Sequence, residues 1–124
     1  MRAIRVLLMI ASGLVCAPMT GERLDELQIP LMVPKNTEPH RTAFTVSVDY
    51  KQGILMPSLT YYQGTTTGIS AHDRALTARK LADPNEQNGA AFSRPGHIFP
   101  LRYHEGGVLQ RAGHTEASIG NTLL

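Results

Sequence analysis

The sequence predicts a single α/β domain, and two observations point to this fold class. A chain of 124 residues is long enough for one domain with a real hydrophobic core, and its apolar fraction of 42% is ordinary for a globular protein. Helix and strand patterns then alternate along the chain, separated by turns that contain proline and glycine.

The first predicted elements are a strand and a short helix. Residues 13–19 (GLVCAPM) form a mostly apolar run that is typical of a short buried strand. Thr20 is a suitable N-cap for a helix over residues 22–27, which Pro30 stops. The segment 31–39 that follows is predicted to be a loop.

A second strand and a longer helix come next. Residues 43–49 (AFTVSVD) alternate between apolar and polar side chains, which predicts a strand with one face on the core. The core-facing residues of this strand are expected to be Phe44, Val46 and Val48. Ser70 and Asp73 form a capping-box-like start for a helix that reaches about Leu81, and a turn-rich connection over residues 83–90 follows it.

The last third of the chain predicts two more strands and a final helix. Residues 97–101 and 107–110 are the strand candidates, because both are short and rich in apolar side chains. Thr115 is expected to cap the final helix.

The N-terminal segment 1–16 has basic residues followed by an apolar run, which is the outline of a secretory signal peptide with a lipidated cysteine. Val15, however, is not the small residue that such cleavage favours before Cys16. We interpret residues 2–12 as a core helix, because the apolar run continues directly into the predicted strand at residues 13–19. The run is also too short to span a bilayer. A secreted or lipidated binding protein is the alternative. A lone cysteine suits a reducing compartment, and we expect a cytoplasmic location.

The charge pattern gives no reason to expect a nucleic-acid or membrane partner. The net charge is only +2, and the twelve lysines and arginines are dispersed with no basic run. The chemistry is expected instead in two glycine–histidine motifs, 94–101 (RPGHIFPL) and 111–117 (RAGHTEA). Glycine permits close approach of a ligand, a neutral histidine can bind a metal or move a proton, and arginine holds phosphate through paired donors. Together they predict a site for a small phosphorylated substrate and a divalent metal.

Three further motifs, at residues 13–20 (GLVCAPMT), 64–74 (GTTTGISAHDR) and 106–109 (GGVL), complete a pattern along the chain. With them the chain resembles the 3,4-dihydroxy-2-butanone 4-phosphate synthase family of riboflavin biosynthesis. The likeness runs in order over residues 13–118, so that residues 1–124 are interpreted as one partial domain of this family. The resemblance implies an α/β fold with a mixed twisted sheet and flanking helices, and a homodimer with sites near the subunit interface.

The resemblance also implies roles for individual residues. His97 matches an essential catalytic residue, and burial beside an apolar strand would keep its ring neutral and ready to accept a proton. His114 matches a Mg²⁺ or Mn²⁺ ligand. Substrate and phosphate binding is implied for Arg111, Ala112, Gly113, His114, Thr115, Cys16, Thr66, Thr67 and Asp73. The residues themselves leave structural alternatives open: a core histidine for His97, a strand-end histidine for His114, an inert buried thiol for Cys16 and a helix cap for Asp73.

The implied activity is a metal-assisted lyase reaction on D-ribulose 5-phosphate, which yields 3,4-dihydroxy-2-butanone 4-phosphate and formate. One segment interrupts the family pattern: residues 54–64 (ILMPSLTYYQG) carry no charge and many large apolar groups, and we interpret them as translated intervening sequence or an error in the gene's assigned exons. The family's acidic loop and a further catalytic glutamate are not found in the 124 residues. The alternative to a synthase is therefore a catalytically inactive fragment of the family, or a product of wrongly assigned exons.

Overall fold

The computed structural model describes residues 14–51 and 66–123. The predicted helix over residues 2–12 and the interrupting segment 54–64 lie outside these ranges. The elements follow in the order β1 (Cys16–Met19), α2 (Gly21–Glu26), β2 (Val48–Tyr50), α3 (Ala71–Ala82), β3 (Phe92–Arg102) and α4 (His114–Leu123), with short 3-10 helices at Gly89–Ala91 and Gly107–Leu109. None of the helices in the described part of the chain is long and apolar enough to cross a membrane.

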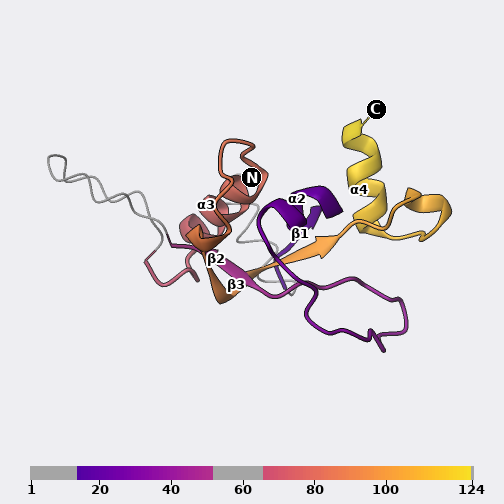
Figure 1. Ribbon diagram of the computed structural model, residues 1–124, viewed down its shortest axis with the longest axis horizontal. Coiled ribbons are helices and arrows are strands. Elements are labelled where there is room, and N and C mark those ends of the chain that lie inside the picture. The colour runs from indigo at the N-terminus through magenta and orange to yellow at the C-terminus, as the bar shows by residue number, and fades with distance from the viewer. Residues whose placement is uncertain (1–13, 52–65, 124) are drawn as a thin grey trace, which may run out of the picture.

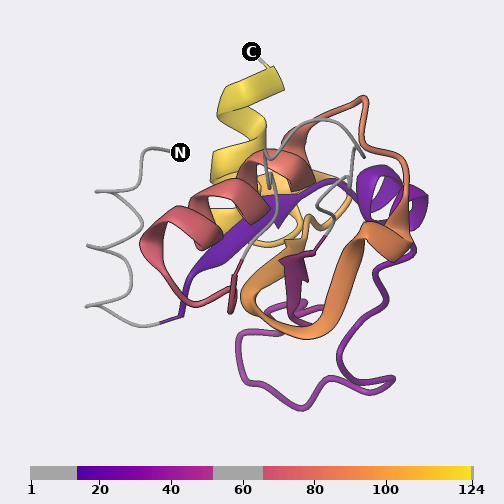
Figure 2. The same ribbon diagram turned by 90° about the vertical axis from the view of Figure 1, so that its left-hand side faces the viewer.

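The three strands form one mixed sheet with β3 in the centre (Figure 1). β1 pairs with β3 in parallel, with Cys16 opposite Phe99, whereas β2 pairs with β3 antiparallel. α3 contacts both β2 and β3, while α4 contacts β1 and stands beyond the end of β3 (Figures 1 and 2). The expected α/β fold with a mixed sheet and flanking helices is therefore confirmed.

β3 departs from regular pairing at residues 94–97, and we call this segment the β3 excursion. Val48 pairs with Ile98, but the next residue on β2, Asp49, pairs with Ser93. The four intervening residues therefore leave the ladder, and side chains at and just before β2 accept two of their backbone N–H groups. The Gly96 N–H donates to Ser47 Oγ at 3.1 Å, and the His97 N–H donates to Asp49 Oδ1 at 2.8 Å. Arg94-Pro-Gly-His97 thus projects from the sheet rather than continuing it.

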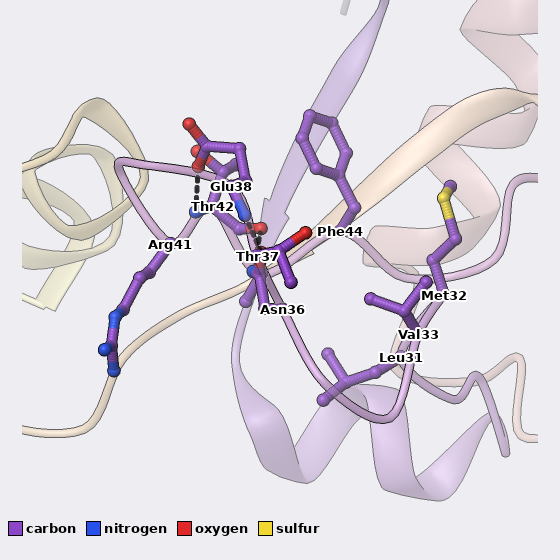
Figure 3. Close-up of a pocket in the computed structure, with 10 residues that line it drawn as sticks. Leu31, Met32, Val33, Asn36, Thr37, Glu38, Arg41, Thr42 and Phe44 are labelled. Atoms are coloured by element: carbon purple, nitrogen blue, oxygen red, sulfur yellow. Dashed lines mark hydrogen bonds between the residues drawn. The ribbon is translucent and has the colours of Figure 1, made fainter.

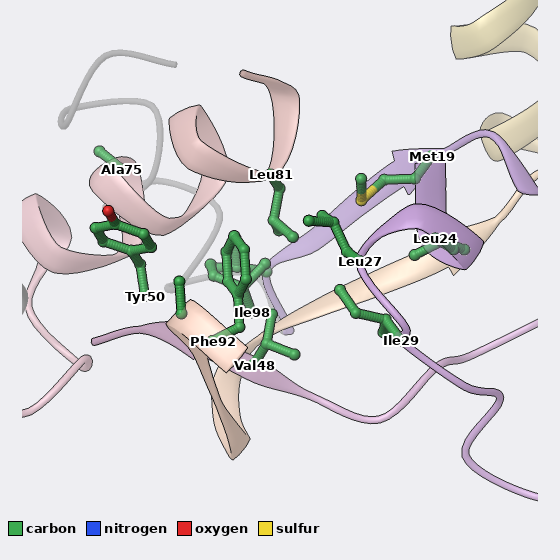
Figure 4. Packing of buried hydrophobic residues seen from close by; sticks show 12 residues of the cluster. Met19, Leu24, Leu27, Ile29, Val48, Tyr50, Ala75, Leu81, Phe92 and Ile98 are labelled. Atoms are coloured by element: carbon green, nitrogen blue, oxygen red, sulfur yellow. The ribbon is translucent and has the colours of Figure 1, made fainter. Parts of the chain in front are cut away.

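The core lies between the sheet and helices α2 and α3 (Figure 4). Its largest fully buried apolar side chains include Leu24 and Leu27 at α2, Leu81 at the end of α3 and Ile98 on β3. Arg23 of α2 links this helix to α3, because its guanidinium donates hydrogen bonds to main-chain carbonyls at and beyond the end of α3. These acceptors are the carbonyl oxygens of Leu81 at 2.9 Å, Asp83 at 2.7 Å and Glu86 at 2.7 Å. Such contacts satisfy carbonyls that a helix end leaves without partners.

Two of the three predicted helix starts are confirmed. Thr20 Oγ1 accepts a hydrogen bond from the Arg23 N–H at 3.3 Å, and Ser70 Oγ accepts one from the Asp73 N–H at 3.0 Å. Both are N-caps of helices that begin at the next residue.

Three local predictions are wrong. Residues 107–109 form a 3-10 helix rather than a strand, with Gly106 and Gly107 both in the left-handed region (φ +92° and +65°). Thr115 does not cap the last helix, because that helix begins one residue earlier, at His114. The strand predicted over 43–49 is a regular strand only at Val48–Tyr50, with isolated bridges at Phe44 and Thr45, and Thr45 and Ser47 are buried while Phe44 and Val46 are only partly buried. Hydrogen bonds make this burial possible, since Thr45 Oγ1 donates to the Pro100 carbonyl at 2.9 Å.

Candidate active site

A pocket of about 390 Å³ lies where α4 begins. Its lining is His40, Thr42, Leu101 and the run Arg111–Thr115. The structure therefore brings five consecutive predicted site residues together, with the exposed His114 at the first position of α4 and Thr115 buried behind it. The first N–H groups of a helix have no partner within the helix and are suited to an anion.

Arg111 is fixed from three sides. Its Nε donates to the His40 carbonyl at 3.0 Å, and its Nη2 donates to Thr42 Oγ1 at 3.1 Å. Its Nη1 forms an ion pair with Glu116 Oε2 at 2.7 Å. The guanidinium therefore joins the loop at residues 40–42 to the first turn of α4 and forms one wall of the pocket.

Glu116, the ion-pair partner of Arg111, is not among the site residues predicted from the sequence. Its side chain is 1% exposed, and its Oε1 also accepts the His104 N–H at 3.3 Å. Burial raises the pKa of this carboxyl, but hydrogen bonds from its own N–H, Arg111 and His104 together bring it below its ordinary value. A Cβ on Gly113 would clash with Arg111 Nη1 and lie 2.6 Å from Glu116 Oε2. The glycine of the motif thus makes room for the ion pair.

His97 lies on the β3 excursion and pairs with Asp49. Its Nδ1 is 2.6 Å from Asp49 Oδ2, in addition to the bond between its N–H and Asp49 Oδ1. The His97 side chain is 37% exposed, so the expected burial is wrong; the Asp49 side chain, 9% exposed, is the buried member. The sequence offered no signal for Asp49, because it is 48 positions away from His97 and sits within an ordinary strand pattern.

The threonine-rich motif forms a loop that Asp73 anchors. Asp73 Oδ2 accepts hydrogen bonds from Thr66 Oγ1 at 2.8 Å, the Thr66 N–H at 3.2 Å and the Gly68 N–H at 3.1 Å. Thr66 and Thr67 are exposed beside this anchor. Cys16 is half-buried on β1, and burial raises the pKa of its thiol, which disfavours the thiolate. Direct roles of these residues toward a substrate stay predictions.

We expect Asp73→Asn to lower the free energy of unfolding by about 1.5–3 kcal/mol near pH 7, because a buried carboxylate with several donors is replaced by an amide. Burial raises the pKa of Asp73, but bonds from Thr66, Gly68 and Ser70 bring it below its ordinary value of 3.8. This stabilisation is complete above that value and is lost as the pH falls through the lower folded-state pKa. Urea titrations from neutral to strongly acidic pH should show the two proteins converging in acid. An equal gap at every pH contradicts the assignment, and the exposed Glu105→Gln is the control.

The predicted residues fall into separate groups. The lining of the pocket at α4 does not include His97, Cys16 or the threonine-rich loop. His97 lies four residues before Leu101, the β3 residue of the pocket, which is roughly 13 Å along an extended strand. No cluster of three or more His, Cys, Asp or Glu side chains able to hold a metal ion occurs within residues 14–51 and 66–123.

A second hollow, of about 380 Å³, lies in the loop between α2 and β2 (Figure 3). Its walls are apolar side chains such as Leu31, Val33 and Phe44, beside the polar Glu38 and Arg41. The Glu38 carboxylate accepts the N–H groups of His40 and Thr42, at 2.9 and 2.7 Å, and so holds the loop that Arg111 also contacts. None of the predicted site residues lines this hollow.

Comparison with known proteins finds one consistent set of relatives. The family model for 3,4-dihydroxy-2-butanone 4-phosphate synthase matches residues 1–120. The chain is 56% identical over 109 residues to the synthase of Schizosaccharomyces pombe, and 57% identical over 109 residues to that of Agrobacterium fabrum. Each alignment covers 88% of this chain but only 48% and 46% of the relative, so the chain spans about half the length of these proteins. A solved structure of a synthase in complex with two magnesium ions superposes with a TM-score of 0.78 at 50% identity, over 93% of this chain and 49% of that one.

Proposed function

Because this chain belongs to the 3,4-dihydroxy-2-butanone 4-phosphate synthase family, we propose that it acts in riboflavin biosynthesis and converts D-ribulose 5-phosphate to 3,4-dihydroxy-2-butanone 4-phosphate and formate. The observation that carries the proposal is the pocket formed by Arg111–Thr115 at the start of α4. Its fixed guanidinium and helix N-terminus are suited to a phosphate group.

Each group in the pocket has a proposed task. Arg111, Ala112, Gly113 and Thr115 hold the phosphate and orient the sugar, and the hydroxyl of Thr42, which accepts a hydrogen bond from Arg111, adds a polar group to the lining. His97 is proposed to accept a proton from a sugar carbon when the substrate enolises. Its half-exposed ring supports this role, because a base must reach the substrate.

A divalent cation is proposed to bind through His114, which supplies one nitrogen ligand. Mg²⁺ and Mn²⁺ prefer oxygen ligands, and the described residues offer no carboxylate cluster beside this imidazole. The residues of the pocket do not by themselves fit such a cation, so no step of the reaction is assigned to it. We expect calorimetry to find Mg²⁺ affinity no tighter than roughly millimolar.

We further propose that two copies of the chain share each site. One substrate must contact both the phosphate pocket and the base, yet His97 is not among the residues that line the pocket. A homodimer in which His97 of one copy faces the pocket of the other meets this requirement, because a two-fold interface repeats every such contact.

The test measures formate release from ribulose 5-phosphate with Mg²⁺. We expect His97→Ala and His114→Ala each to lower the rate by about 10²–10⁴-fold, and the exposed His72→Ala, in the first turn of α3, to leave it unchanged. Mixing the two inactive variants should restore about a quarter of the wild-type rate, because half of the dimers are mixed and each carries one intact site. Formate release by neither the wild type nor the mixture would instead support an inactive member of the family.

A further inference from the structure

His97 is held at two points by one carboxylate. Asp49 Oδ1 accepts the His97 N–H at 2.8 Å, and Asp49 Oδ2 lies 2.6 Å from His97 Nδ1. Asp49 belongs to β2, where the register shift relative to β3 occurs. The same carboxylate therefore supports the backbone of the β3 excursion and the imidazole that projects from it.

The threonine-rich loop keeps Asp49 in place. Gly68 has a φ of +88°, and a Cβ at this position would clash with the Asp49 carboxylate. The Gly68 N–H is bound to Asp73, which also anchors Thr66. Asp73 of α3 thus fixes the loop, and the backbone of Gly68 packs against Asp49. The Asp49 carboxylate therefore has little room to turn away from His97.

We infer that Asp49 is a positioning residue that sets the tautomer of His97, so that Nδ1 carries the proton and Nε2 is the basic nitrogen. An ionised carboxylate only accepts hydrogen bonds, so the short contact requires a proton on Nδ1. Nε2 then faces away from Asp49 on a ring that is 37% exposed. This inference rests on the proposed function, in which His97 is the base.

The two contacts make Asp49→Asn a selective change. An asparagine side chain has one acceptor oxygen. The backbone N–H of His97 can only donate, so this oxygen must accept its hydrogen bond. The amide NH₂ then faces Nδ1, which must give up its proton and accept. The substitution therefore keeps the shape of the site but moves the ring proton to Nε2, which is the wrong tautomer for a base that works through Nε2.

The experiment uses the full chain labelled with ¹⁵N-histidine, with the His97 signals assigned by comparison with His97→Gln. We expect the neutral ring to carry its proton on Nδ1 in the wild type and in Asp25→Asn, whose carboxylate pairs with Arg102 instead. In Asp49→Asn we expect the proton on Nε2, with the melting temperature nearly unchanged. Formate release should fall by about 10²–10⁴-fold in kcat, with KM close to wild type.

Two results of the tautomer measurement overturn the inference: a wild-type ring protonated on Nε2, or an Asp49→Asn ring that keeps its proton on Nδ1. An Asp49→Asn variant that unfolds, and whose KM rises as much as its kcat falls, would also contradict the inference. That pattern is expected of a residue with a structural role alone. The proposed function fails differently, since a wild-type chain that releases no formate leaves the ¹⁵N measurement intact.

Discussion

Replacing Gly96 with alanine is expected to destabilise the domain by roughly 3 kcal/mol, near the upper end of overpacking costs. A Cβ at Gly96 would clash with the carbonyl group of Val48 and the nitrogen of Asp49. These are backbone atoms of the neighbouring strand, so no side chain can turn aside to make room. Relief requires β2 to separate from the β3 excursion, which also pulls Asp49 away from His97. Urea unfolding followed by circular dichroism measures the loss.

Gly120→Ala is the matched control for Gly96→Ala. It makes the same chemical change inside α4, where a Cβ meets nothing within 4 Å. Alanine is the better helix former by about 1 kcal/mol, so this variant should be slightly more stable than the wild type. If the two variants prove equally stable, then the close approach of β2 to Gly96 does not constrain the fold.

Arg111→Ala is expected to lower the free energy of unfolding by about 3–5 kcal/mol, because it leaves the buried Glu116 carboxylate without its counter-ion. It also removes the bonds to the His40 carbonyl and to Thr42, and so releases the loop from α4. Thermal and urea unfolding of the full chain measure the effect, and binding of the proposed substrate, ribulose 5-phosphate, should be lost in parallel.

A double variant separates the ion pair from simple packing. Arg111→Ala combined with Glu116→Gln should be more stable than Arg111→Ala alone, since no charge is then left buried. Arg102→Ala breaks the exposed pair with Asp25 and should change the unfolding free energy far less. If the losses of unfolding free energy in Arg111→Ala and in Glu116→Gln simply add up to the loss in the double variant, then the two side chains have no interaction energy as an ion pair.

Features with a local cause could be predicted from the sequence. Thr20 and Ser70 cap their helices because the hydroxyl and the N–H that it meets lie three residues apart. The motif at residues 111–115 does gather in one pocket, because consecutive residues before a helix remain neighbours in space.

The predictions failed where the partner is distant or the pattern is ambiguous. Residues 107–109 resemble a strand in their apolar side chains, yet Gly106 and Gly107 adopt left-handed backbone that a strand does not use. Alternation places Thr45 toward solvent, but a hydrogen bond to Pro100, 55 positions away, satisfies its hydroxyl in the interior. The pairing of Asp49 with His97 likewise depends on a strand register that no local pattern encodes.

The central position of β3 has a consequence for synthesis on the ribosome. β1 and β2 both pair with β3, which is the last of the three strands to leave the ribosome. About eighty residues must be synthesised after Cys16 before its partner Phe99 is added to the chain. At translation speeds of about 5–20 residues per second, β1 remains unpaired for roughly 4–16 s in the nascent chain. Unpaired strands are templates for association between chains. The period in which this domain can aggregate during its own production is therefore set by the speed of translation, and slow codons before β3 would lengthen it.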